Sequence, residues 1–162
     1  AKKRSALLEL QALMREGEDE EAPNKRYLTL LVGKMPQGTM TVEAPLLRLT
    51  GGGDRSVRVD PKGKPSVSHF KLLERRSGHS FCEVVIETGR THQIRVHAQH
   101  IGHPVAGDDK YGDREANKRL AEQAGLKRLF LHAAAMSFDL AGKPYTLNAP
   151  LADELSAALD RL

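Results

Sequence analysis

The sequence predicts an α+β fold, with packed helices on a mostly antiparallel, partly mixed β-sheet. Three observations indicate this class. Short apolar stretches with a two-residue period are joined mostly by short turns, which is typical of antiparallel strands. Amphipathic segments with a helical period stand between these stretches and at both ends of the chain. With 162 residues, 40% of them hydrophobic, the chain can form one domain with a buried core.

The strands are predicted from apolar stretches bounded by turn residues. Gly33 ends the first of them, and the turn Ser77-Gly78 joins two others as a hairpin. The turn Ala141-Gly142 joins the last two in the same way. The predicted strands cover residues 27–32, 40–44, 56–59, 67–75, 81–87, 129–138 and 145–147.

The helices are predicted from their period and their caps. A first helix over residues 7–14 follows Ser5 as N-cap and ends at Gly17. Thr91 can cap a second helix over residues 92–101, which Gly102 ends. Two further helices are predicted over residues 114–124 and 153–162.

The net charge is +4, from 25 Lys and Arg against 21 Asp and Glu, and its placement is more informative than its size. Residues 88–107 contain no carboxylate, and residues 55–76 contain seven Lys or Arg and only two acids. Such stretches suit a polyanion, most commonly nucleic acid, although ordinary solvated faces are the alternative. No apolar stretch is as long as a membrane span and no leader opens the chain, so a soluble, cytoplasmic protein is expected. The sequence does not indicate an oligomeric state, and a monomer is the default expectation.

Cysteine and histidine usage argues against a metal site. Cys82 is the only cysteine, which excludes an intrachain disulfide and a thiolate zinc site. His97 and His100 could share a helix face, but no carboxylate or thiolate is near them, so hydrogen-bonding or RNA-contacting roles fit better. Asp108 and Asp109 are expected to form a turn and cap rather than an acid–base pair. We therefore expect no metal.

The helix after Gly89 carries the most informative pattern. At about 100° per residue, His92, Arg95 and Gln99 share one face, opposite an apolar face that includes Ile94. An arginine, an imidazole and an amide at a helix start, where backbone N–H groups add a positive end, suit a phosphate or a carboxylate. A structural arginine that bridges to a neighbouring strand is the alternative.

Three segments resemble the RluA-type pseudouridine synthases. Residues 89–97, Gly-Arg-Thr-His-Gln-Ile-Arg-Val-His, continue into Gly-His-Pro-Val-Ala-Gly-Asp and Tyr-Gly-Asp, and together these closely resemble the third signature motif of that family. Residues 25–33 look like its tyrosine-bearing strand, and residues 128–133 look like its late hydrophobic strand. Residues 115–120 are similar to one member that modifies large-subunit rRNA. The resemblance covers essentially the whole chain.

The resemblance implies isomerisation of uridine to pseudouridine in RNA, without metal or cofactor: the N1–C1′ bond breaks, the uracil turns, and C5 is joined to the sugar. It implies that Arg95 holds a catalytic aspartate, and that Tyr27 stacks on the flipped base and is a candidate for proton transfer. Ile94 and Leu131 would form apolar walls, with core packing as the alternative for Tyr27 and Leu131. The expected RNA contacts, to large-subunit rRNA, are Arg90, His92, Gln93 and Gln99.

The family's aspartate motif, His-Arg-Leu-Asp, is not among the 162 residues. We therefore expect residues 1–162 to be the carboxy-terminal part of one catalytic domain, without a separate RNA-binding module, inactive alone and with Arg95 unpaired. The interpretation requires Arg95 and Tyr27 to share a cleft, and no other acid to seal Arg95 into the interior. A non-catalytic RNA-binding or assembly module is the competing hypothesis, which the coding sequence upstream of Ala1 would distinguish. A zinc-dependent hydrolase that uses the histidines is a third hypothesis.

Overall fold

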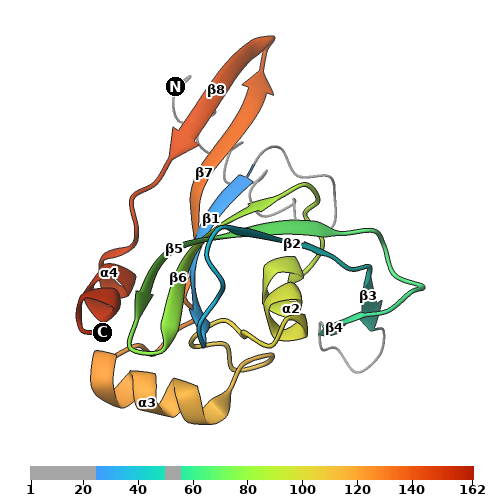
Figure 1. Cartoon of the computed structure of the whole chain (residues 1–162). Helices are drawn as coiled ribbons and strands as arrows, with labels where there is room; N and C mark the ends of the chain where they lie inside the picture. Colours follow the sequence, from blue (N-terminus) through green and yellow to red (C-terminus); the bar gives the residue numbers. More distant parts are fainter. Residues whose placement is uncertain (1–24, 50–55) are drawn as a thin grey trace.

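A computed structural model describes residues 25–49 and 56–162 (Figure 1). Its centre is a six-stranded sheet in the order β2-β5-β6-β1-β7-β8, beside a two-stranded sheet of β3 and β4. Every strand pair in both sheets is antiparallel. The strands are β1 (Lys25–Val32), β2 (Thr39–Glu43), β3 (Leu46–Leu49), β4 (Ser56–Val59), β5 (Val67–Arg76), β6 (His79–Ile86), β7 (Leu131–Leu140) and β8 (Lys143–Asn148).

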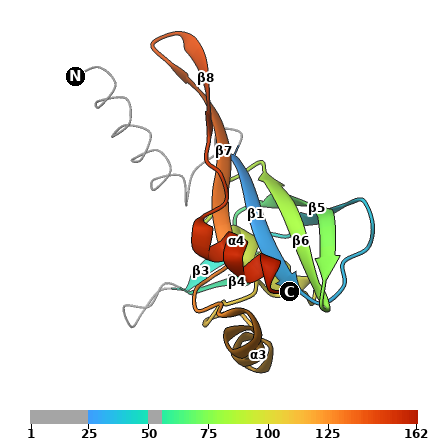
Figure 2. The same cartoon turned by 90° about the vertical axis from the view of Figure 1, so that its left-hand side faces the viewer.

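Three helices cover the two faces of the large sheet (Figures 1 and 2). They are α2 (Gln93–His100), α3 (Arg114–Ala124) and α4 (Asp153–Asp160). Adjacent residues of a strand point to opposite faces of its sheet, and here Leu31 packs in the same cluster as α2 while Leu30 packs in the cluster of α3 and α4. Both leucines are fully buried, so the alternation along β1 separates the two halves of the core.

Strand β1 is central because it pairs with β6 on one side and with β7 on the other. Its pairing with β7 shifts register between Arg26 and Tyr27. Such irregularities bend a strand and re-aim side chains, and they are frequent next to functional sites. The shift therefore lies where the side chain of Tyr27 leaves the strand.

The predicted α+β class and antiparallel sheet are confirmed, and each observed element except β3 overlaps a range predicted for it. Strand β4 and helix α3 coincide with their predicted ranges, and α3 ends at Gly125 in the left-handed conformation that favours glycine. Strand β3 was not predicted, because its sequence Leu-Leu-Arg-Leu does not alternate. The helix predicted over residues 7–14 lies outside the described residues. None of the helices within residues 25–49 and 56–162 has the length and apolar character needed to cross a membrane.

Candidate active site

A cavity of about 320 Å³ lies between one face of the large sheet and the start of α2. This volume is within the range of small-molecule sites. Its sheet side is formed by β1, by the end of β6, by β7 and by Leu129 just before β7. The opposite side is formed by Gly89, Arg90 and residues 92–95, which include the first turn of α2. A sheet face and a helix start thus enclose a space that is open to solvent on one side.

Strand register explains the residues on the sheet side. Lys25 and Tyr27 are two residues apart in β1, so their side chains leave the same face. Ile86 of β6 is the partner of Lys25, and Ala133 of β7 is the partner of Tyr27. Leu131, two residues before Ala133, also lines the cavity. The wall is therefore one tyrosine and one largely buried lysine among small and apolar side chains.

The helix side is held in place by the side chain of Gln93, which is 3% exposed. Its Oε1 accepts hydrogen bonds from the Thr88 hydroxyl at 2.7 Å and from the Arg90 N–H at 3.1 Å. Its Nε2 donates to the carbonyl of Val67 and to the hydroxyl of Ser68, both at 2.9 Å. These bonds join the start of α2 to the start of β5. Both polar atoms of the Gln93 amide are therefore engaged within the protein.

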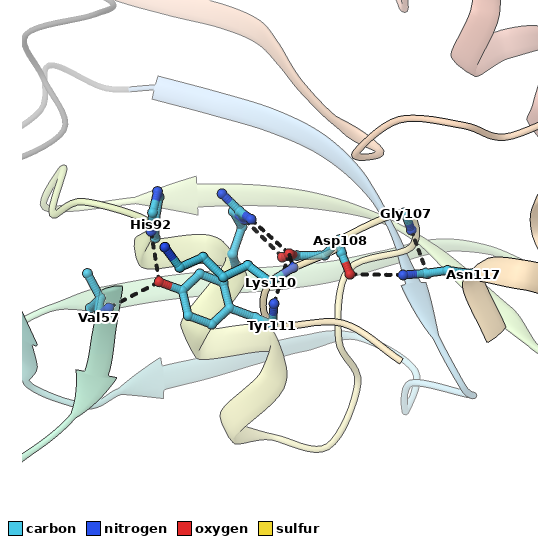
Figure 3. Close-up of polar contacts among 8 residues, drawn as sticks. Val57, His92, Gly107, Asp108, Lys110, Tyr111 and Asn117 are labelled. Atoms are coloured by element: carbon cyan, nitrogen blue, oxygen red, sulfur yellow. Dashed lines mark hydrogen bonds and ion pairs between the residues drawn. The ribbon is translucent and has the colours of Figure 1, made fainter. Parts of the chain in front are cut away.

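His92 and Tyr111 form a second brace at the start of α2 (Figure 3). The Tyr111 hydroxyl lies 2.8 Å from Nδ1 of His92 and accepts a hydrogen bond from the N–H of Val57 at 3.0 Å. The two rings meet edge to face, with centroids 5.4 Å apart. His92 has φ 54°, a left-handed conformation that is rare for residues other than glycine and is held only where the surroundings enforce it.

Arg95 forms a two-point ion pair with Asp108. Its Nε donates to Oδ2 at 2.9 Å and its Nη2 donates to Oδ1 at 2.8 Å. The side chain of Asp108 is fully buried, whereas that of Arg95 is 16% exposed and lines the cavity. The guanidinium also lies over the ring of Tyr111, with Cζ 5.1 Å from the centroid. Arg95 is therefore fixed from behind while part of it faces the cavity.

Both members of this pair remain charged. Burial alone raises the pKa of Asp108, but the hydrogen bonds from Arg95 and from the N–H groups of Tyr111 and Lys110 outweigh it, so the pKa lies below its ordinary value. The hydrogen bond to Asp108 raises the pKa of Arg95 above an already high value, against the opposing effect of burial. A carboxylate behind a cavity-lining guanidinium is thus a permanent feature of the site at neutral pH.

The loop that carries Asp108 is tightly built (Figure 3). The side chain of Asn117 accepts from the N–H of Gly107 at 2.8 Å and donates to the carbonyl of Asp108 at 2.9 Å. Gly107 has φ 77°, and a Cβ there would lie 2.0 Å from the carbonyl oxygen of Arg128. Only glycine fits this position, and the loop therefore delivers Asp108 to Arg95 in one orientation.

Seven of the eight site residues predicted from the sequence line this one cavity, and they come from three separate segments of the chain. The seven are Tyr27, Arg90, His92, Gln93, Ile94, Arg95 and Leu131. The eighth, Gln99, is exposed on α2 outside the cavity. The requirement that Arg95 and Tyr27 share a cleft is therefore met by the geometry.

Two expectations at this site are wrong. The first is that Arg95 is unpaired: the buried carboxylate of Asp108 forms an ion pair with it. Asp108 does form the expected turn, since its Oδ1 accepts hydrogen bonds from the backbone N–H groups of Lys110 and Tyr111 at 3.0 Å. Arg95 keeps 16% of its side chain exposed, so this acid does not seal it into the interior. The N-cap of α2 is His92 rather than Thr91, because the left-handed backbone of His92 delays the helix to Gln93.

The histidines of this region serve different roles. His97 is fully buried, with Nδ1 2.8 Å from the Ser68 hydroxyl and Nε2 2.9 Å from the carbonyl of Ala44. Burial lowers its pKa, so the ring is neutral. Across residues 25–49 and 56–162, no group of three or more His, Cys, Asp or Glu side chains is arranged to hold a metal ion.

Sequence reasoning missed Lys25, Asp108 and Tyr111 as parts of the site. Lys25 could have been found from the period of β1, because it shares a face with Tyr27. Asp108 and Tyr111 are in the strings that resemble the family motif, but nothing in their spacing from Arg95 indicates a contact. That contact depends on the loop between α2 and α3 folding back against the helix.

The sequence and the fold of this chain are similar to those of known proteins. Residues 1–100 match a family described as RNA pseudouridylate synthase. Ribosomal large subunit pseudouridine synthase C of Escherichia coli O157:H7 is 45% identical over 166 residues, which cover 100% of this chain and 51% of that protein. The Salmonella typhi protein of the same name is 46% identical with the same coverage, and that of Vibrio vulnificus is 43% identical, with 100% and 50% covered. The chain spans about half the length of these curated relatives.

Two solved structures share the fold. Human RNA Pseudouridylate Synthase Domain Containing 1 superposes with a TM-score of 0.70 at 25% identity, over 91% of this chain and 62% of that one. Human RNA Pseudouridylate Synthase Domain Containing 4 superposes with a TM-score of 0.68 at 21% identity, over 97% of this chain and 67% of that one. The antiparallel sheet with its three helices is therefore the architecture of these domains.

Proposed function

The chain belongs to the RNA pseudouridylate synthase family, and from this premise we propose that its cavity holds the uracil ring of a uridine in RNA that is isomerised to pseudouridine. The observation that carries the proposal is the meeting of Tyr27, Arg95, Ile94 and Leu131 in one cavity of about 320 Å³. A uracil offers a flat π face and a few polar edge atoms. An aromatic ring between apolar walls, with polar groups at one end, suits such a ligand.

The target base must leave its stack to reach a site of this kind. We propose that Tyr27 supplies the surface on which the extruded uracil stacks, since stacking on an aromatic ring stabilises a bound base by about 1–3 kcal/mol. Ile94 and Leu131 would exclude water from its faces. The Tyr27 hydroxyl is the candidate group for moving the proton at C5 after the base has turned and rejoined the sugar.

Arg95 is proposed to hold the reacting aspartate of the family. A guanidinium has five N–H donors, and the two bonds to Asp108 use Nε and one N–H of Nη2. Within the described part of the chain, no hydrogen bond from Nη1 is seen. Asp108 would therefore fix the rear edge of Arg95 while its remaining donors keep a second carboxylate ionised in an apolar pocket.

We propose large-subunit rRNA as the RNA partner, because three relatives of 43–46% identity carry that target in their names. Arg90 and His92 at the cavity and Gln99 on the exposed side of α2 are the proposed contacts, and the engaged amide of Gln93 would act by holding this segment in place. We also propose that the protein is a cytoplasmic monomer that uses no metal and no cofactor. The 162 residues are proposed to form the carboxy-terminal part of one catalytic domain.

The test is release of tritium from RNA labelled at uridine C5. The 162 residues lack His-Arg-Leu-Asp, so we expect no release by this polypeptide alone and release by the product of the whole reading frame that contains it. In that product, Arg95→Lys should abolish turnover, because lysine cannot make a two-point pair with one carboxylate and keep donors for another. Arg128→Lys is the matched control, since Arg128 is exposed and pairs with Glu154 at the surface.

Two outcomes would contradict the proposal. Turnover by the 162 residues alone would show that the chemistry does not need the absent motif. RNA binding without turnover by the whole product would favour the non-catalytic RNA-binding or assembly module instead.

A further inference from the structure

A second cavity, of about 250 Å³, lies beside the first, between the β3–β4 hairpin and the loop that precedes α2. Four basic side chains from three separate segments line it: Arg48 from β3, Lys62 and Lys64 from the turn after β4, and Arg90 from the loop before α2. No carboxylate is among its lining residues in the described part of the chain. Four positive charges therefore surround one small space.

The fold places the two lysines here by a close backbone approach. The N–H and the carbonyl of Leu46 bond to the carbonyl and the N–H of Lys64, at 2.9 and 2.8 Å. Gly63 makes this approach possible, because a Cβ at that position would lie 2.4 Å from the carbonyl carbon of Leu46. Lys62 and Lys64 thus flank a turn that is pinned against β3, and their side chains are exposed.

The nearest acid of this turn is already engaged. Asp60 accepts from the guanidinium of Arg58, with 3.0 Å between Nη2 and Oδ2, and its Oδ1 accepts from the N–H of Lys62 at 2.9 Å. It shapes the turn without lining the cavity. Of the seven Lys and Arg in residues 55–76, Lys62 and Lys64 line this cavity, and Arg58 pairs with Asp60 beside it.

Arg90 connects the two cavities, because it lines both of them. Its Nε donates to the carbonyl of Pro65 at 3.2 Å, which holds its side chain between the base cavity and the turn of the two lysines. A nucleotide with its base in the first cavity must leave its sugar and phosphates outside that cavity. The second cavity adjoins the first at Arg90, so its charges lie within reach of such a backbone.

We propose that the second cavity is a phosphodiester subsite, which takes the backbone phosphate next to the uridine whose base occupies the first cavity. This inference rests on the proposed function and assigns Arg48, Lys62 and Lys64 a role within it. Arginine suits phosphate oxygens through its planar fork, and lysine adds a mobile point charge. Contacts of this kind position a nucleic acid without reading its sequence.

The test is the salt dependence of RNA binding by the full chain. Binding of a short, fluorescein-labelled single-stranded RNA is followed by anisotropy between about 50 and 200 mM KCl for the unsubstituted chain and for Lys62→Gln/Lys64→Gln. The slope of log affinity against log salt should become shallower by about 0.7 for each phosphate that the protein no longer neutralises. Lys62→Arg/Lys64→Arg should keep the original slope, since the charge remains.

The matched control is Lys118→Gln/Lys127→Gln. These two exposed lysines line another basic cavity, beside α3, and their substitution changes the net charge equally. An unchanged slope in Lys62→Gln/Lys64→Gln, or an equal change in the control, would overturn the subsite while leaving the proposed function intact. Failure of the unsubstituted chain to bind RNA would overturn the subsite, whereas the proposed function is tested separately by tritium release from the whole product.

Discussion

Arg95 and Asp108 are joined by two nearly equal hydrogen bonds, Nε to Oδ2 at 2.9 Å and Nη2 to Oδ1 at 2.8 Å. The carboxylate is fully buried, and the guanidinium keeps one part toward the cavity. Asp108 thus sets where the arginine lies, while Arg95 itself lines the cavity. Arg95 was the central residue of the sequence-based hypothesis, whereas its anchor belongs to the loop that follows the helix.

Substitution of Asp108 should destabilise the protein strongly. Asp108→Asn keeps an oxygen for the N–H groups of Lys110 and Tyr111 but removes the charge that meets Arg95. Leaving a largely buried guanidinium without its carboxylate should lower the free energy of unfolding by about 3 kcal/mol, as measured by urea denaturation. Asp109→Asn is the control, because Asp109 is the next residue and is exposed. Equal losses in the two variants would show that the pair does not anchor Arg95.

Local signals predicted the elements, but not the contacts that complete the site. The hairpin at Ser77-Gly78 and the helix that ends at Gly125 follow from turn and cap chemistry close in sequence. The meeting of Tyr27 with Arg95 followed only from resemblance to a family, because the two residues are far apart in the chain. The left-handed His92 could not be predicted, since its conformation is imposed by Tyr111 and by the hydrogen bonds of Gln93.

The buried His97 should make the stability of the protein depend on pH. Folding lowers the pKa of this residue, so the folded state holds the ring neutral while the unfolded chain takes up a proton near pH 6.5. The contribution of His97 to the free energy of unfolding should therefore be fully present above pH 6.5, and the free energy of unfolding should decrease as the pH falls below that value. Protonation would place a hydrogen on Nδ1 facing the Ser68 hydroxyl, which already accepts from Gln93.

His97→Gln is the test variant for this effect, because an amide can accept from one neighbour and donate to the other without titrating. Urea denaturation at pH 7.5 and 5.5 should show a smaller pH-dependent loss in the variant than in the unsubstituted chain. His100→Gln, at an exposed position on the same helix, should leave the loss unchanged. The same loss in His97→Gln would show that another group is responsible.

The single thiol should be unreactive while the protein is folded. Burial raises the pKa of Cys82 to about 12, and the side chain is fully buried in the cluster of β6 and α2. The reactive thiolate is therefore scarce and inaccessible in the folded protein. Ellman's reagent at pH 8 should react with the native chain only at the rate of unfolding, and immediately once the chain is unfolded in about 8 M urea. Rapid reaction of the native chain would contradict the placement of Cys82 in the core.

The ring and the hydroxyl of Tyr27 have separate proposed roles, which two substitutions distinguish. Tyr27→Phe keeps the ring and removes the hydroxyl, so the product of the whole reading frame should bind RNA with unchanged affinity and lose turnover by about 10²- to 10⁴-fold, the usual contribution of a proton-transfer group. Tyr27→Leu should also weaken binding, by about 1–3 kcal/mol, because stacking is lost. RNA affinity is measured by anisotropy and turnover by tritium release. Full turnover in Tyr27→Phe would leave Tyr27 as a stacking surface alone, and unchanged affinity in Tyr27→Leu would remove it from the base site.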